Sequence, residues 1–87
     1  MRYYPHVHKR AKILEAMCNN PRDWRIEDLL VVAKQFDIEC RNNGGSHHVF
    51  GFPNVGMDVT VSAHRPIKPV YIRQFLLLVD AVKELQK

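Results

Sequence analysis

The hydrophobic pattern of this chain changes its period twice, and that change restricts the fold more than any other feature. Residues 9–19 and 25–36 carry apolar side chains every three or four positions, which predicts two amphipathic helices. The period then shortens to two, which predicts three short strands at residues 38–41, 47–52 and 57–62. The helical period returns at residues 70–85, the longest predicted helix. The predicted order is therefore α-α-β-β-β-α.

Both connections between the predicted strands are short. Residues 42–46 read Asn-Asn-Gly-Gly-Ser and residues 53–56 read Pro-Asn-Val-Gly, and both are typical of tight turns. Two short connections in a row predict a three-stranded antiparallel meander. A chain of 87 residues has room for one core. We therefore expect a single α+β domain over residues 1–87, with helices packed on one face of the sheet.

Composition excludes several classes of protein. The uncharged apolar runs are too short to cross a bilayer, and the amino terminus lacks the apolar stretch of a secretory signal. The two cysteines, Cys18 and Cys40, lie in no CxxC motif and are expected to be buried as small apolar residues. These features predict a cytoplasmic protein without a membrane association.

Residues 1–14 carry four basic side chains and no acidic one, and the middle of the chain is also basic. Residues 41–79 contain four basic side chains against Asp58 alone, together with three of the five histidines. This distribution predicts a polyanionic partner, most commonly nucleic acid. The alternative is that the net charge of +4 merely keeps a small domain soluble.

Strand alternation sorts the central histidines between the two faces of the sheet. Phe50 and Phe52 are the obvious core residues of their strand, so His48 should point to the core or its margin and His47 to the open face. Turns at the centres of the two loops would place His47 opposite Ser62 on one side and opposite Arg41 on the other. The open face is then predicted to gather one basic patch, formed by His47, His64, Arg41 and Ser62.

Such a patch has the residue types that cleave RNA without a metal. The reaction needs a base for the 2′-hydroxyl, an acid for the leaving 5′-oxygen and positive charge for the phosphorane. Histidine suits the first two roles, since its pKa lies near neutrality. The basic side chains expected to contact phosphate are Arg41, Arg65 and Lys68.

The segment Gly45-Ser46-His47-His48-Val49-Phe50 is followed by a turn with Pro53 and then by Val59-Thr60-Val61-Ser62-Ala63-His64. This ordered pair of motifs resembles the HicA family of bacterial toxins, over roughly residues 25–82. The resemblance implies a double-stranded-RNA-binding-like fold and a metal-independent mRNA interferase of a type II toxin–antitoxin system. It also implies that His47 is the catalytic residue, that single-stranded mRNA is the substrate, and that a HicB-type antitoxin covers that histidine.

The chain also departs from the family pattern. Ser62 stands where the family usually has proline, and residues 65–70 replace the usual start of the last helix. Residues 1–24 form an N-terminal extension that compact members lack. This extension contains His6 and His8, but two ligands without a third do not predict a zinc site, and no cofactor is expected.

Each candidate residue has an alternative role. His47 could cap a turn or contact phosphate, and His48 could be a satisfied margin histidine or the catalytic base if the register is slipped. His64 could bond a backbone carbonyl or act as an acid, and Ser46 could orient the histidine loop or simply occupy a turn. For the whole domain, the alternative function is a non-catalytic RNA-binding or protein-interaction module on the same fold.

Overall fold

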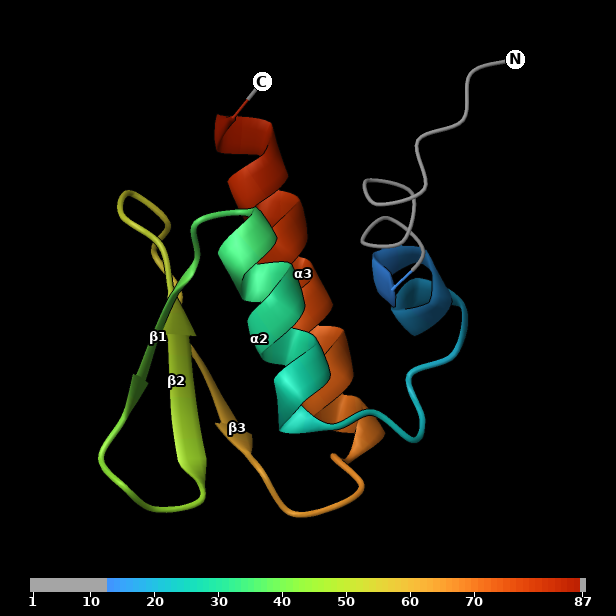
Figure 1. Ribbon diagram of the computed structural model, residues 1–87. Coiled ribbons are helices and arrows are strands. Elements are labelled where there is room, and N and C mark those ends of the chain that lie inside the picture. The colour runs from blue at the N-terminus through green and yellow to red at the C-terminus, as the bar shows by residue number, and fades with distance from the viewer. Residues whose placement is uncertain (1–12, 87) are drawn as a thin grey trace.

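The structure, a computed structural model, describes residues 13–86 and has the predicted order of elements. Residues 13–19 are helical, and they are followed by α2 (Ile26–Gln35), β1 (Glu39–Asn42), β2 (His47–Gly51), β3 (Val59–Ser62) and α3 (Pro69–Leu85). The strands form one antiparallel sheet in the order β1-β2-β3 (Figure 1). The prediction of an α+β domain with a three-stranded meander is confirmed.

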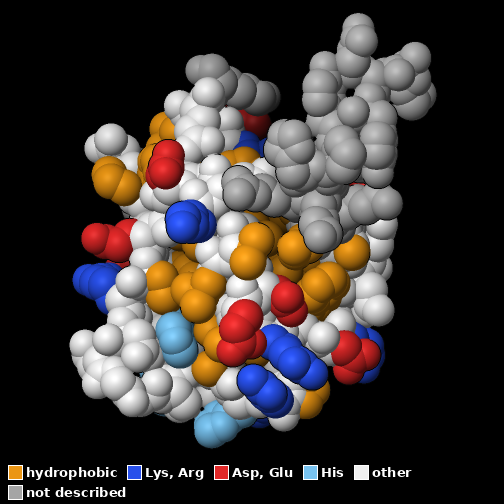
Figure 2. All heavy atoms as spheres, in the orientation of Figure 1, with side chains coloured by type: hydrophobic (Ala, Val, Ile, Leu, Met, Phe, Trp, Pro, Cys, Tyr) orange, Lys and Arg blue, Asp and Glu red, His pale blue; other side chains and the backbone are white. Residues whose placement is uncertain are grey.

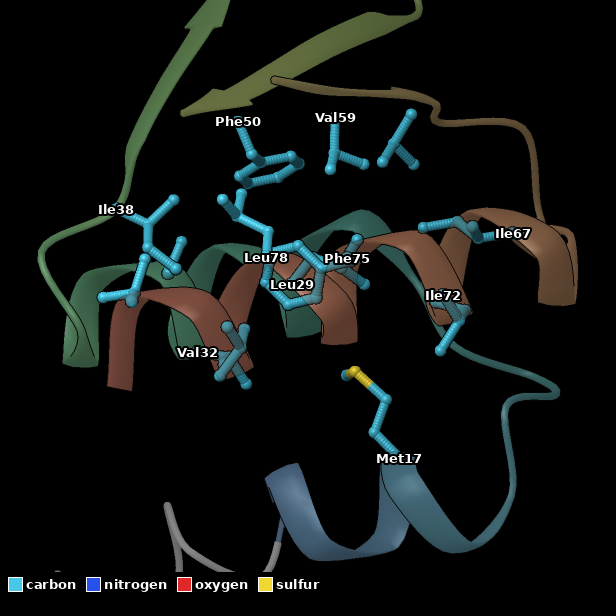
Figure 3. Close-up of a cluster of buried hydrophobic side chains, with 14 residues drawn as sticks. Met17, Leu29, Val32, Ile38, Phe50, Val59, Ile67, Ile72, Phe75 and Leu78 are labelled. Carbon is cyan, nitrogen blue, oxygen red and sulfur yellow. The ribbon is translucent and has the colours of Figure 1, made fainter. Parts of the chain in front are cut away.

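The domain has three layers. Phe50 and Val59 point from the inner face of the sheet toward α2 and α3, while Met17 of the N-terminal helix points into the same helices from the other side (Figure 3). All three side chains are at least 97% buried, since their exposed fractions are 0%, 3% and 0%. The N-terminal helix, whose sequence lies in the predicted extension, therefore contributes to the core of the domain.

The end of α2 sets the position of the first strand. Asp37 adopts a left-handed φ of 59°, and the amide of Ile38 donates to the carbonyl of Ala33 at 2.8 Å. A second bond runs from the amide of Asp37 to the carbonyl of Lys34 at 3.3 Å, which completes a Schellman motif. The last residue of this motif is normally apolar and packs back on the helix, and Ile38 is 6% exposed here. The chain consequently leaves the helix directly into β1.

Helix α3 begins at Pro69, one residue before its predicted start at residue 70. Proline suits this position because its fixed φ fits the helix and its missing N–H would have no intrahelical partner. The loop before it is tied to the segment before α2, because the amide of Ile67 donates to the carbonyl of Trp24 at 3.0 Å. The indole of Trp24 in turn donates to the carbonyl of Asn20 at 2.6 Å. None of the helices described over residues 13–86 has the length and hydrophobicity needed to cross a bilayer.

Candidate functional site

The two faces of the sheet differ as the alternation predicts. Phe50 is fully buried on the inner face and packs edge to face against Phe75, with ring centroids 5.0 Å apart. His47 is exposed at the start of β2 and lies directly opposite Ser62 of β3. This pairing confirms the predicted register of the second hairpin and the placement of His47 on the open face.

His47 lies in a shallow hollow at the end of the β1–β2 hairpin. The hollow has a volume of about 530 Å³ and is lined by Arg41, Asn43, Gly45, His47 and Val49. It brings one imidazole and one guanidinium together beside the backbone of a glycine-containing turn. These groups provide an acid–base group and a positive charge at a surface open to solvent.

The first hairpin corrects the predicted pairing of Arg41 with His47. Arg41 lies opposite Val49, and the last pair of this ladder is Asn42 with His48. The pairing is thus displaced by two residues, because the turn is centred on Gly45 and not on Gly44. An even displacement keeps every side chain on its predicted face, so Arg41 and His47 still share the open face and line the same hollow.

The side chain of Asn42 holds this turn together. Its Nδ2 donates to the carbonyl oxygens of Gly45 at 2.9 Å and His47 at 2.8 Å, and its Oδ1 accepts from the amide of Gly44 at 2.9 Å. The last bond forms an Asx turn, and it supports the left-handed φ of 91° at Gly44. Sequence analysis treated Asn42 only as a turn residue, although an Asn two residues before a Gly is a recognisable signal for this arrangement.

Arg41 has a partner that sequence analysis did not predict. Its Nη2 lies 3.3 Å from Oδ2 of Asp58, and both side chains are about 60% exposed. Gly51 lies between them on β2, and a Cβ at that position would approach Oδ1 of Asp58 to 2.5 Å. The missing side chain at Gly51 therefore lets Asp58 lie over the central strand and reach Arg41. Because the pair is exposed, water and salt screen it, and a phosphate can compete for the guanidinium.

His48 points inward, as predicted. It lies opposite the fully buried Val61, and it is half-buried at the margin of the core. Its Nδ1 atom is buried and has no hydrogen-bond partner. Of the two neighbouring histidines, the structure therefore presents only His47 at the hollow.

The remaining predicted site residues lie outside the lining of the hollow. Ser46 is half-buried, and its carbonyl accepts from the amide of Ala63 at 2.7 Å, which extends the pairing of β2 with β3. His64 is exposed in the loop that follows. Arg65 lies 3.7 Å from Glu27 in an exposed ion pair, and Lys68 precedes α3 beside a second hollow near Asp23.

The basic side chains do not form one uninterrupted patch. Lysine and arginine side chains lie beside aspartate and glutamate side chains over the surface seen in Figure 2, in keeping with the Arg41–Asp58 and Arg65–Glu27 ion pairs. Of the three predicted phosphate ligands, the structure thus places only Arg41 in the hollow with His47.

The cysteines differ from each other. Cys18 is exposed on the N-terminal helix, so the prediction that it is buried is wrong. Cys40 is half-buried, and burial raises the pKa of its thiol above the ordinary value of 9.0. Within residues 13–86 no group of three histidine, cysteine or acidic side chains could hold a metal ion, and His6 and His8 lie outside the described residues.

Comparison of the chain with protein-family models, with curated proteins and with solved structures finds no match. The assignment of a function therefore depends on the hollow around His47 and on the resemblance of the two sequence motifs.

Proposed function

We propose that this protein is a metal-independent endoribonuclease of the HicA type, a toxin that cleaves single-stranded mRNA with His47 as its catalytic residue. The observation that carries the proposal is the position of His47, exposed on the open face of the sheet in one hollow with Arg41. The three-stranded meander backed by helices is compatible with the double-stranded-RNA-binding-like fold that the resemblance implies.

The proposed reaction is an internal transesterification. His47 accepts the proton of a ribose 2′-hydroxyl, whose oxygen attacks the adjacent phosphorus while the bond from phosphorus to the 5′-oxygen breaks. The leaving oxygen takes a proton from the imidazolium or from water, and the products end in a 2′,3′-cyclic phosphate and a 5′-hydroxyl. Arg41 stabilises the negative charge that develops on the phosphorane, once the phosphate has displaced Asp58 from the guanidinium.

The decisive experiment compares two exposed histidines of the same chain. Purified wild-type, His47→Ala and His64→Ala proteins are incubated with a single-stranded RNA in the presence of a metal chelator. Loss of a general acid–base group lowers the rate by roughly 10²–10⁴-fold, so His47→Ala should be nearly inactive. His64 lies outside the hollow, so His64→Ala should stay within a few-fold of wild type. An RNA with one 2′-deoxyribose should resist cleavage at that position.

The same variants can be tested in bacteria. Induction of the wild-type chain should arrest growth and degrade mRNA, whereas the His47→Ala chain should be tolerated while remaining folded. If both chains arrest growth, the catalytic residue is not His47. The proposal also includes a cytoplasmic location and a HicB-type antitoxin that covers His47, and this antitoxin should restore growth when expressed with the wild-type chain.

One observation favours a second candidate, a non-catalytic RNA-binding or protein-interaction module. His47 is the only histidine among the residues that line the hollow, which include no carboxylate, and Arg41 is already paired with Asp58. Under this alternative, RNA binds with a conventional dependence on salt but is not cleaved, and replacement of His47 changes little. Intact RNA after incubation with the folded wild-type chain would favour this module over the nuclease.

A further inference from the structure

The outer edge of β1 is an unpaired sheet edge next to an apolar groove. The strand order β1-β2-β3 places β1 at one end of the sheet, and no other strand within residues 13–86 pairs with its outer side. An exposed edge presents free backbone amides and carbonyls, so it is a ready template for a strand from another chain.

Two hydrogen bonds show which backbone groups of β1 face outward. The carbonyl of Ser46 accepts from Ala63 on the β3 side, and the carbonyl of His47 accepts from the side chain of Asn42 on the β1 side. Successive residues of an antiparallel strand direct their backbone groups to opposite sides. Val49, two residues after His47, therefore directs its backbone groups toward β1, and they meet those of Arg41, which lies opposite. Cys40, the residue before Arg41, directs its amide and carbonyl the other way, to the free edge.

The groove beside this edge lies between α2 and β1. It has a volume of about 470 Å³, and its lining is formed by Leu30, Ala33, Lys34, Asp37, Ile38 and Cys40. Leu30 is 37% exposed there, although its side chain is large and apolar. The two charged residues of the lining have opposite signs, so the groove carries no net charge that would repel a copy of itself.

We propose that β1 pairs antiparallel with the β1 strand of a second copy of this chain, with Cys40 on the twofold axis. In this register Glu39 lies opposite the partner's Arg41, and Arg41 lies opposite the partner's Glu39. The sheets of the two domains then form one continuous sheet of six strands. Both α2 helices lie on the same face of this sheet, and the apolar groove of one domain packs against that of the other.

The pattern of charge on β1 argues for a second copy rather than an unrelated chain. Glu39 and Arg41 are both exposed on the open face, one residue on either side of Cys40. A twofold axis through Cys40 places Glu39 of each chain opposite Arg41 of the other, so each charge meets its opposite without any change of sequence. The guanidinium has further N–H donors besides the Nη2 that faces Asp58, so it can bind both carboxylates. Because Cys40 faces outward with its backbone, Glu39 and the partner's Arg41 form a non-hydrogen-bonded pair, in which side chains lie closest. The edge is thus complementary to itself.

Disulfide crosslinking tests the position of the axis. The Cys18→Ser chain keeps only Cys40, and the Cys40→Ser chain keeps only the exposed Cys18. Both full-length chains are oxidised under identical conditions, and the yield of covalent dimer is measured on non-reducing gels. Random collision favours the exposed Cys18, since burial raises the pKa of Cys40 and lowers its thiolate fraction. A several-fold higher dimer yield from the chain that keeps Cys40 is expected, because paired residues in this register have Cα atoms within disulfide range.

Charge reversal tests the register. Glu39→Arg places like charges at both cross-strand positions, and Arg41→Glu does the same with the opposite sign. Each variant alone should dimerise roughly tenfold or more weakly than wild type, because both attractive pairs become repulsive. An equimolar mixture of the two variants restores opposite charges at both positions, so it should form a heterodimer with about the affinity of the wild-type chain.

Sedimentation velocity over a range of concentrations measures these affinities. A wild-type chain that stays monomeric at all concentrations, or a mixture that dimerises no better than either variant alone, would overturn the proposal. Preferential crosslinking through Cys18 would do so as well. None of these outcomes depends on RNA cleavage, so the dimer and the ribonuclease can fail separately.

Discussion

Replacement of Asn42 by Ala tests whether one side chain holds the turn that carries His47. The variant loses three hydrogen bonds of 2.8–2.9 Å, two that Nδ2 donates to carbonyls and one that Oδ1 accepts from the amide of Gly44. Each bond contributes about 0.5 kcal/mol at this exposed site, the lower end of the usual range, because water can replace a lost partner. The free energy of unfolding should therefore fall by about 1.5 kcal/mol, which lowers Tm by roughly 6–12 °C in a domain of this size.

The adjacent asparagine provides a matched control. Asn43 is exposed beside the same turn, and the structure records no side-chain hydrogen bond for it, so Asn43→Ala should change stability by less than about 0.5 kcal/mol. Asn42→Asp keeps the acceptor for Gly44 but cannot donate to the two carbonyls, so it should recover only a part of the lost stability. Urea unfolding of the four chains measures these differences. Equal stability of the Asn42→Ala and Asn43→Ala chains would refute the assignment of the turn to Asn42.

Three further predictions concern the core, the cysteines and the ion pair. Phe50→Ala removes a fully buried ring at the centre of the sheet and should cost about 3–5 kcal/mol in urea unfolding; a cost below about 1 kcal/mol would contradict the packing. Near neutral pH an alkylating reagent should modify Cys18 faster than Cys40, and Cys40→Ala should reduce the loss of stability as pH rises above 9.0. The sign follows because the thiol of Cys40 has a raised pKa when folded, so the unfolded chain loses its proton first; equal rates and identical pH profiles would be inconsistent with its burial. Asp58→Asn frees Arg41 from its ion pair and should tighten the binding of single-stranded RNA by roughly two- to fivefold at low salt, measured by fluorescence anisotropy; unchanged or weaker binding would show that Arg41 does not contact phosphate.

The central strand shows how far alternation alone can predict a site. The positions of Phe50 and His48 on the inner face, and of His47 on the outer face, follow from a period of two and one aromatic anchor. The pairing of His47 with Ser62 also follows, since a turn centred between residues 54 and 55 fixes the register of both strands. These features are local, so the sequence contains enough information to derive them.

The first hairpin shows where local reasoning ends. Its turn residues are correct, but its register depends on the three bonds of the Asn42 side chain, and composition does not reveal which asparagine makes them. Arg65 and Lys68, which were predicted to contact phosphate, lie outside the hollow for a similar reason, because the direction of the loop after β3 depends on its bond from Ile67 to Trp24.

The sequence by itself determined the order of the elements, the two faces of the sheet and which of the neighbouring histidines, His47 or His48, is exposed, because period and parity are properties of neighbouring residues. Tertiary structure alone decided that Asp58 crosses over Gly51 to reach Arg41, that Met17 enters the core from behind the helices, and that Nδ1 of His48 lacks a partner. These contacts join residues far apart along the chain or depend on which atoms the packed core leaves accessible. Their positions follow from packing in three dimensions, which no local pattern encodes.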